Sequence, residues 1–297
     1  MWFVYALVTS LAWGGADLFY KKGTDSKDKY SHVKIAIMVG LAMGIHATIY
    51  LFANGLSISA WDMVRYLPVS GLYILSMIIG YVGLRYLNLS IASPVQNASG
   101  VVVTILLVIF FRSSVSTLEI IGIVLITLGV IVIAILDKGK VDLKIGGADK
   151  KYTISFLAIF IPILYCFIDG LGTFADAIYL DEMKLISEDA ALIAYEYTFF
   201  IVAAVLFIYL KIKKVPFNVF KEKDKGIAAI LETAGQFFYV YAMSSNAVVT
   251  APLVAVYSIF SVIFSRIFLK EKLKPLQYVI IGIVFVGIAL MGIAESI

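Results

Sequence analysis

The sequence predicts an all-α integral membrane protein with ten transmembrane helices, arranged as two five-helix inverted-topology repeats around a central cavity. Three observations support this prediction: an apolar composition, ten apolar stretches of spanning length, and an internal repeat. Of the 297 residues, 62% are hydrophobic and only 15% are charged, and the mean hydropathy is +0.98. A water-soluble domain cannot bury that much apolar surface in one core, so a membrane is the expected solvent.

Apolar stretches of spanning length recur from one end of the chain to the other. A spanning helix needs about 20 mainly apolar residues, because each residue rises about 1.5 Å through a layer about 30 Å thick. Unpaired backbone amides are too costly in hydrocarbon, and the alternating pattern of barrel strands is absent, so we predict helices. The run after Met1 shows no cleavage pattern, so we expect the first span to be retained. The predicted spans are residues 2–20, 31–54, 66–86, 90–111, 117–137, 152–180, 189–211, 226–243, 248–269 and 274–294.

Basic residues concentrate in the loops that follow the first, third, fifth, seventh and ninth spans. These loops hold almost all of the lysines, whereas the other loops hold only Arg65, Arg112 and Lys184. Loops rich in lysine and arginine stay on the cytoplasmic side of a membrane. The lysine pattern therefore predicts that both termini lie outside.

The two halves of the chain resemble each other after a shift of 158 residues. The polar segment DKGKVDLKIGGADKK lies between them, so we predict a first repeat at 1–140, a cytoplasmic linker at 141–151 and a second repeat at 152–297. Five spans per half is an odd number, so the copies must enter the membrane from opposite sides, as in many secondary transporters. The matched pairs include Tyr81 with Tyr239, Asn88 with Asn246, Pro94 with Pro252, Phe110 with Phe268 and Gly129 with Gly287.

Two segments resemble the paired repeats of the EamA type of the drug/metabolite transporter (DMT) superfamily. They are YLNLSIASPVQNASGVVVTILLVIFF and YAMSSNAVVTAPLVAVYSIFSVIFSRIFLKEKLKPLQYVIIGIVFVGIAL, and LAWGGADLFYKK resembles the Trp-Gly signature of the family's first helix. Pro94 and Pro252 match the family's proline, and Glu271 matches its acidic turn residue. The resemblance implies ten helices around a cavity, with the fifth and tenth peripheral. It also implies transport of small organic metabolites by alternating access, often outward.

The chain departs from the family pattern in two places. Ser113 stands where the first-repeat counterpart of Glu271 is expected. Family members are more often described with cytoplasmic termini, which conflicts with the lysine pattern. The orientation therefore stays open at this point.

Five carboxylates fall within the predicted spans, and such groups are by default candidates for a transport path. We expect Asp169 and Glu196 to meet in the outer half of the membrane. Asp17 and Glu232 are expected in the inner half. Carboxylates at two depths suit a carrier of cations or protons. Asp17 and Asp176 have an alternative position near the headgroups, and Asp169 has an alternative role at a helix break between two glycines. The five carboxylates are Asp17, Asp169, Asp176, Glu196 and Glu232.

A polar stripe on the ninth span is a candidate substrate site. Glu232, Gln236 and Tyr239 share one helical face, where an acid, an amide and a phenol suit an amine on an organic body. The stripe has the alternative role of joining helices. Tyr81 takes the repeat position of Tyr239, and Trp13 lies one turn before Asp17, where it stacks on substrate or fills space.

Proline and amide side chains mark the start of the fourth span. We predict that Pro94 lies in the first helical turn, where its missing N–H costs no hydrogen bond. With Pro252 in the second copy, it would form a pair of gating hinges. Gln96 and Asn97 come just behind, and either bind substrate or cap the hairpin. Gly40 and Gly44 form a GxxxG pattern that indicates helix packing.

Other classes of function find little support in the sequence. The single cysteine, Cys166, has no nearby histidine, and His46 stands alone in its span, so we expect neither a metal site nor a catalytic pair. Nothing resembles a nucleotide-binding loop, so transport would be driven by gradients. A scaffold or receptor would leave the buried acids unexplained.

We therefore predict a secondary transporter of an amine-bearing or zwitterionic metabolite, such as an amino acid or an organic cation. Export across the cell membrane is the expected direction, and protons are the candidate coupling ion. The alternative is a facilitative importer of a nucleobase, a sugar or a quaternary amine. We expect no enzymatic activity, no cofactor and no nucleic acid partner. The protein is expected as a multi-pass monomer or homodimer with the bilayer and a small-molecule substrate as partners.

Overall fold

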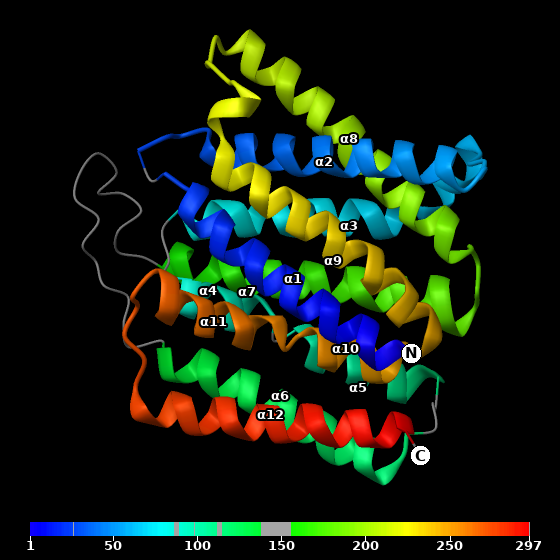
Figure 1. Ribbon diagram of the computed structural model, residues 1–297, viewed down its shortest axis with the longest axis vertical. Helices are drawn as coiled ribbons and strands as arrows, with labels where there is room; N and C mark the ends of the chain where they lie inside the picture. The colour runs from blue at the N-terminus through cyan, green and yellow to red at the C-terminus, as the bar shows by residue number, and fades with distance from the viewer. Residues whose placement is uncertain (26, 86–88, 98, 112–114, 138–155, 297) are drawn as a thin grey trace.

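The computed structural model describes residues 1–25, 27–85, 89–97, 99–111, 115–137 and 156–296. Every regular element in this part of the chain is helical (Figure 1). The predicted linker at 141–151 and Ser113 lie outside the described residues. The elements are α1 (Trp2–Gly23), α2 (Ser31–Ala53), α3 (Ala60–Leu84), α4 (Leu89–Gln96), α5 (Ser99–Phe111), α6 (Thr117–Asp137), α7 (Phe156–Ala177), η2 (Ile178–Glu182), α8 (Glu188–Ile212), η3 (Val219–Lys221), α9 (Lys223–Ser245), α10 (Ala247–Val254), α11 (Tyr257–Phe268) and α12 (Pro275–Ser296).

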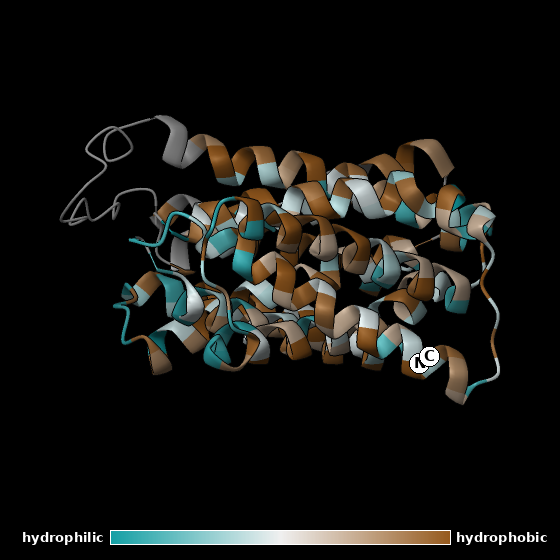
Figure 2. Ribbon diagram, turned by 90° about the horizontal axis from the view of Figure 1, so that it is seen from above, coloured by the Kyte–Doolittle hydropathy of each residue, from teal (hydrophilic) through white to brown (hydrophobic). Residues whose placement is uncertain are grey.

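Seven of the described helices are long and apolar enough to cross a membrane, and shorter helices accompany them. Figure 2 shows hydrophobic residues along the helices and hydrophilic residues gathered at the two ends. The prediction of an all-helical membrane protein is therefore confirmed. The seven are Trp2–Gly23, Ser31–Ala53, Ala60–Leu84, Phe160–Glu182, Glu188–Ile212, Ala247–Phe268 and Pro275–Glu295. Helix α9 is not among them, because it carries the polar stripe of Glu232 and Gln236 as well as charges in its first turn.

The two termini lie together at one end of the bundle, which we call the terminal end (Figure 1). The Met1 ammonium forms an ion pair with the Glu295 carboxylate there. The opposite end, where Lys21 and Lys22 close α1, we call the lysine-rich end. Serine caps start helices at the terminal end: Ser59 accepts from the Asp62 N–H at 3.0 Å in a capping box. Such caps pair backbone donors that the first turn of a helix leaves free.

The helix boundaries repeat with the shift of 158 residues. The shift carries α4 onto α10 without any offset, carries the first residue of α5 onto that of α11, and does the same for α6 and α12. The packing repeats as well: α1 packs against α9 and α11, and their counterparts α7, α3 and α5 pack together in the same way. Helix α2 packs on its own counterpart α8, and α6 on α12. The two halves are thus related by an approximate two-fold axis that passes through these last two contacts.

Glycines allow the closest helix contacts. A Cβ on Gly40 would overlap the Phe199 carbonyl oxygen of α8, and one on Gly44 would meet the Phe200 ring at 2.5 Å. The GxxxG prediction for this helix is therefore confirmed, because only glycines let the two backbones approach so closely. Gly122 in α6 faces Gly287 in α12 in a similar way, and this helix pair forms one edge of the bundle (Figure 1).

Two of the predicted continuous spans are each broken into two helices. Helix α4 ends at Gln96 before α5 begins, and α10 ends at Val254 before α11 begins. Pro94 and Pro252 are each the sixth residue of their helix, α4 and α10, so the prediction that Pro94 lies in the first turn is wrong. A proline at that position has no N–H for the carbonyl four residues earlier, which weakens the helix just before each break.

Each short helix is held at its N-terminus by a carboxylate from a distant part of the chain. The Leu89 N–H of α4 donates to Glu271 at 3.3 Å. The Ala247 N–H of α10 donates to Asp181 at 2.7 Å. The repeat would place residue 113 opposite α10, but a serine stands at that position, and Asp181 of η2 supplies the carboxylate instead. Both carboxylates also suit the positive end of the helix dipole.

We expect Asp181→Asn to lower the free energy of unfolding by about 1–2 kcal/mol, because a charged acceptor at a helix N-terminus becomes neutral. The measurement is the thermal midpoint of the purified protein in detergent. Glu271→Gln, which weakens the matching anchor of α4, should lower the midpoint by a similar amount. An unchanged midpoint in Asp181→Asn would show that the bond does not hold α10.

Candidate functional site

A central cavity lies between the two halves of the bundle. It holds about 820 Å³ of space between atoms, counted out to its open mouth. None of its described lining residues comes from α2, α6 or α12. The residues that line it are Trp13, Asp17, Tyr20, Tyr73, Met77, Gly80, Tyr81, Leu84, Gln96, Asn97, Ser99, Gly100, Tyr165, Asp169, Thr173, Tyr195, Glu232, Gln236, Tyr239, Ala251, Val254, Ala255 and Tyr257.

Three carboxylates line the cavity, and each is held by neutral donors. Asp17 accepts from Ser93 at 2.6 Å and from Ser261 at 2.7 Å. Asp169 accepts from Ser99 and Ser76, at 3.1 and 3.3 Å. Asp17, on the first helix of the first repeat, accepts from Ser261 on the broken span of the second repeat. Asp169, on the first helix of the second repeat, accepts from Ser99 on the broken span of the first. These two bonds join the two halves.

Glu232 has a different neighbourhood, made of aromatic hydroxyls. It is 7% exposed and accepts from the Tyr20 hydroxyl at 3.3 Å, which in turn accepts from the Tyr81 hydroxyl at 3.2 Å. The Trp13 indole N–H donates to the backbone carbonyl of Glu232 at 3.2 Å. Glu232 is therefore the acid whose side chain has the fewest hydrogen bonds of the three.

No cation balances these acids within the described part of the molecule. None of the lining residues is lysine, arginine or histidine, and none of the three acids takes part in an ion pair among the described residues. Charges in a membrane interior are costly unless they are paired or face water. The arrangement makes the cavity a place where a positive charge is stabilised.

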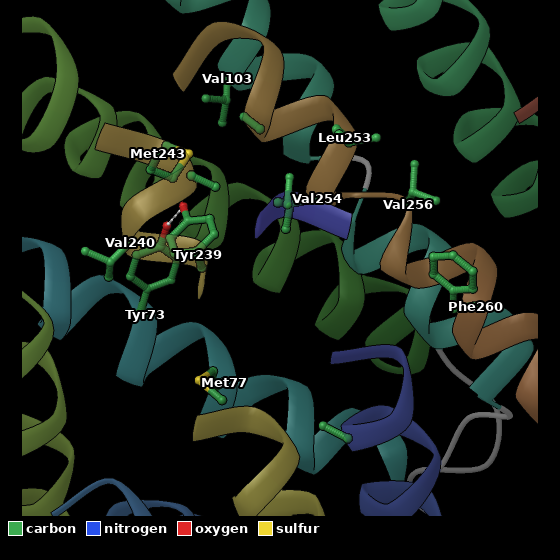
Figure 3. Close-up of a cluster of buried hydrophobic side chains, with 14 of the residues drawn as sticks. Tyr73, Met77, Val103, Tyr239, Val240, Met243, Leu253, Val254, Val256 and Phe260 are labelled. Carbon is green, nitrogen blue, oxygen red and sulfur yellow. Dashed lines mark hydrogen bonds between the residues drawn. The ribbon is translucent and has the colours of Figure 1, made fainter. Parts of the chain in front are cut away.

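Aromatic side chains form a large part of the remaining wall. Of the 18 tyrosines in the chain, seven line the cavity together with one tryptophan. Figure 3 shows Tyr73 and Tyr239 facing each other, with their hydroxyls 2.8 Å apart. The Trp13 ring lies 5.0 Å from that of Tyr239 and 5.6 Å from that of Tyr257, centroid to centroid. Aromatic faces attract cations, so the wall adds to the effect of the acids.

Two buried amides add hydrogen-bond donors to the same cavity. Gln96 is 5% exposed and Gln236 is 1% exposed, and the amide nitrogen of each has no partner among the described residues. A buried donor without an acceptor is costly, so both amides favour a ligand that brings an oxygen.

Eight of the nine predicted binding residues line this cavity. They come from five segments far apart in the sequence and are Trp13, Asp17, Tyr81, Asn97, Asp169, Glu232, Gln236 and Tyr239. Asn97 also donates to the Ser93 carbonyl at 2.9 Å. The polar stripe of α9 thus faces the cavity and, through Glu232, also bonds to α1.

Glu196, the ninth predicted residue, lies elsewhere. It is fully buried between α8 and α2, and both of its oxygens lie within 2.9 Å of His46 Nδ1. The expected meeting of Asp169 with Glu196 is therefore wrong, and so is the view of His46 as an isolated histidine. The meeting of Asp169 with Glu196 fails because of the direction in which Glu196 points from α8. Tyr195 faces the cavity, and the next residue on the helix, Glu196, points about 100° away from it.

The structure excludes the alternative position near the headgroups for both Asp176 and Asp17. Asp176 is 0% exposed and accepts from Tyr66, so it does not face the headgroup region. Asp17 faces the cavity rather than the headgroups. The predicted gating residues Pro94 and Pro252 do not line the cavity, but both lie in the short helices next to it.

The sequence prediction missed five tyrosines: Tyr20, Tyr73, Tyr165, Tyr195 and Tyr257. One signal was present in α3, where the lining residues follow helical spacing from Tyr73 through Met77 and Tyr81. The other four lie on separate helices, so no spacing along the chain connects them.

Two matches to one family model cover nearly the whole chain. The model is described as EamA-like transporter family, and it matches residues 1–135 and 156–293. The chain belongs to the EamA-like transporter family. An EamA-like transporter is a secondary membrane transporter and not an enzyme, so the predicted family and class of function are confirmed. The two matched segments also show two EamA repeats in this multi-pass membrane protein.

A solved structure shares the fold of this EamA-like transporter. It is titled "Crystal structure of protein", with a TM-score of 0.67 and 13% sequence identity, and the match covers 98% of this chain and 96% of that chain. At this identity the likeness concerns the fold alone. The comparison with curated proteins yields no match.

Proposed function

We propose that this EamA-like transporter carries a small organic solute with a positively charged nitrogen and at least one hydrogen-bond acceptor. This description covers amines, organic cations with oxygen groups, and zwitterions such as amino acids. The single observation that carries the proposal is the cavity wall, in which Asp17, Asp169 and Glu232 face a space with no basic side chain in its described lining.

The remaining wall supports the same class of solute. The aromatic rings favour the cationic end of the solute. Gln96 and Gln236 offer amide N–H groups to an oxygen at its other end. A simple anion would face three carboxylates with no basic side chain in the described lining to offset them, and a purely apolar molecule leaves both amides unpaired, so neither is favoured.

We further propose ten membrane crossings, with α4 and α5 as one broken crossing and α10 and α11 as another. The two copies then form inverted repeats, and the broken crossings adjoin the cavity from opposite sides of the membrane. The prolines that weaken α4 and α10 are the proposed hinges of alternating access. The lysine-rich end is the proposed cytoplasmic side.

The remaining features of the proposal concern energy and location. We place the protein in the cell membrane, with export as the direction and a proton gradient as the driving force. The family resemblance supports export, and the acidic cavity supports exchange of a cation for protons. Asp17 and Glu232, which a substrate amine would neutralise, are the residues most directly involved.

A ligand screen tests the proposed solute class. The thermal midpoint of the purified protein is measured with amines, amino acids, quaternary ammonium ions, nucleobases, sugars and dicarboxylates, each at pH 6 and pH 8. We expect stabilisation by members of the first three groups and a stronger effect at pH 8, where protons compete less for the acids. Stabilisation by dicarboxylates or sugars alone would overturn the proposal.

A further inference from the structure

His46 and Glu196 form a buried titratable pair outside the cavity. His46 Nδ1 lies 2.9 Å from one carboxylate oxygen of Glu196 and 2.8 Å from the other. The glutamate side chain is 0% exposed, whereas the histidine side chain is 32% exposed. One partner is thus sealed between helices, and the other is open to the surroundings.

Tyr50, Tyr241 and Asp189 form a hydrogen-bonded cluster between this pair and the terminal end. His46 stacks on Tyr50, with ring centroids 5.9 Å apart. The Tyr50 hydroxyl donates to Asp189 at 2.7 Å, and the Tyr241 hydroxyl of α9 donates to the same oxygen at 2.7 Å. Asp189 lies in the first turn of α8, seven residues before Glu196, which is about 10 Å along the helix at 1.5 Å per residue.

Within the described residues, the ring contacts of His46 are with Tyr50 of α2 and the apolar Phe237 of α9. Asp189 of α8 and Tyr241 of α9 lie one contact farther, bonded to the Tyr50 hydroxyl, and none of these groups carries a positive charge. Within the described residues, no lysine or arginine forms an ion pair with Glu196. The charge of this pair therefore depends on the protons that the pair itself holds.

The pair also lies on a contact between the two halves of the protein. Helix α2 belongs to the first repeat and α8 to the second, and they pack closely where Gly40 and Gly44 face Phe199 and Phe200. The approximate two-fold axis passes through this contact, yet the repeat shift relates His46 to Ala204 and Glu196 to Met38. The pair therefore has no polar counterpart under the repeat, and symmetry of packing does not require it.

A purely structural role is a weak explanation for these two residues. An apolar pair of similar volume would join two helices in lipid without the cost of burying a charge. Removing one partner alone would leave the other charge uncompensated. A group that gains and loses a proton is what distinguishes histidine and glutamate from such an apolar pair.

We propose that the His46–Glu196 pair binds the coupling proton at a site separate from the substrate cavity. A proton enters from the terminal end past Asp189 and Tyr50 and binds the outer ring nitrogen of His46, and the Nδ1 proton moves to the Glu196 carboxylate. The pair then changes from one net negative charge to neutral, with no other atom gained or lost. A neutral pair costs less in hydrocarbon, so proton uptake favours movement of α2 against α8.

Infrared spectroscopy tests the proton site without any substrate. In the wild type, we expect a protonated-carboxyl band to grow as the pH falls from 8 to 5. Glu196→Gln should remove one component of that band, and His46→Gln should shift it. The control is His32→Gln, which changes the other histidine of α2 and should leave the band as in the wild type. If Glu196→Gln leaves every component in place, Glu196 does not take up a proton and the inference is overturned.

Transport tests the coupling, and this part rests on the proposed function. Proteoliposomes are loaded with choline, an organic cation with a hydroxyl oxygen, and both its exchange and its accumulation under a pH gradient are measured. We expect Glu196→Gln to lower gradient-driven accumulation at least about fivefold, with exchange close to wild type. Equal loss of both activities in this variant would overturn the coupling role.

The two proposals fail in different ways. If the wild type neither binds nor moves choline or any amine of the screen, the proposed function fails while the infrared titration still decides the proton site. If amines bind and Glu196→Gln keeps the wild-type titration, only the present inference fails.

Discussion

Replacing Glu232 by glutamine is expected to weaken binding of a cationic substrate by about 30- to 150-fold, which corresponds to about 2–3 kcal/mol. Glutamine keeps the size and the hydrogen bond from Tyr20, so the loss comes from the missing negative charge. The measurement is the substrate concentration that gives half of the maximal thermal stabilisation. Transport in proteoliposomes should fall with it.

Two variants separate the role of this charge from general damage to the fold. Glu188→Gln removes a carboxylate from the first turn of α8, outside the cavity lining, and should leave substrate affinity unchanged. Tyr20→Phe removes the hydrogen bond but keeps the Glu232 charge, so we expect a smaller loss of affinity. Unchanged affinity in Glu232→Gln would remove this residue from the proposed site and leave Asp17 and Asp169 as the candidates.

Replacing Gly40 by alanine is expected to cost at least about 3 kcal/mol in stability, at the upper end for an overpacked contact. The new Cβ would overlap the Phe199 carbonyl oxygen and lie 2.5 Å from the Ala203 Cβ. A backbone carbonyl within a helix cannot turn aside as a flexible side chain would, so α2 and α8 must move apart. The measurement is the thermal midpoint in detergent together with the yield of folded protein.

Gly282→Ala is the matched control, because nothing lies within 4 Å of a Cβ at that position of α12. We expect its effect to stay within about 1 kcal/mol, the range of the helix preference of alanine over glycine. A midpoint for Gly40→Ala close to that of Gly282→Ala would show that the α2–α8 contact tolerates separation. This contact also positions His46 against Glu196. A Gly40→Ala protein that still folds should therefore show an altered infrared titration.

Much of the candidate site could be predicted from single residues. Glu232 and Asp169 stand out because charged side chains are rare in apolar spans, and each was predicted without knowledge of its neighbours. Residues on one helix were also predicted together, as with Glu232, Gln236 and Tyr239, since helical spacing relates them. Tyr195 and Tyr257 carried no such signal, because a tyrosine in an apolar span is common at membrane interfaces as well as in cavities.

The Glu196 error shows where prediction by depth stops. Depth along the membrane follows from residue counts at 1.5 Å per residue, so Asp169 and Glu196 were expected at similar depths on antiparallel helices. Contact between them also required both side chains to face inward. Which way a side chain points depends on how each helix is rotated about its own axis. That rotation is set by packing, here by Gly40 and Gly44 against α8, and brings Glu196 to His46 instead.

The sequence by itself determined the helical membrane fold, the repeat of 158 residues and the separation of the lysine-rich end from the terminal end. These depend on local properties, namely the cost of unpaired backbone in lipid, the length of apolar runs and the spacing of matched residues. Only the tertiary structure decided which acids share a cavity, where the fourth span of each repeat breaks, and that Asp181 holds α10 in place of a turn carboxylate. These depend on contacts between residues far apart in the chain, and in an almost uniformly apolar sequence such contacts are chosen by shape and close packing, which leave no periodic pattern to read.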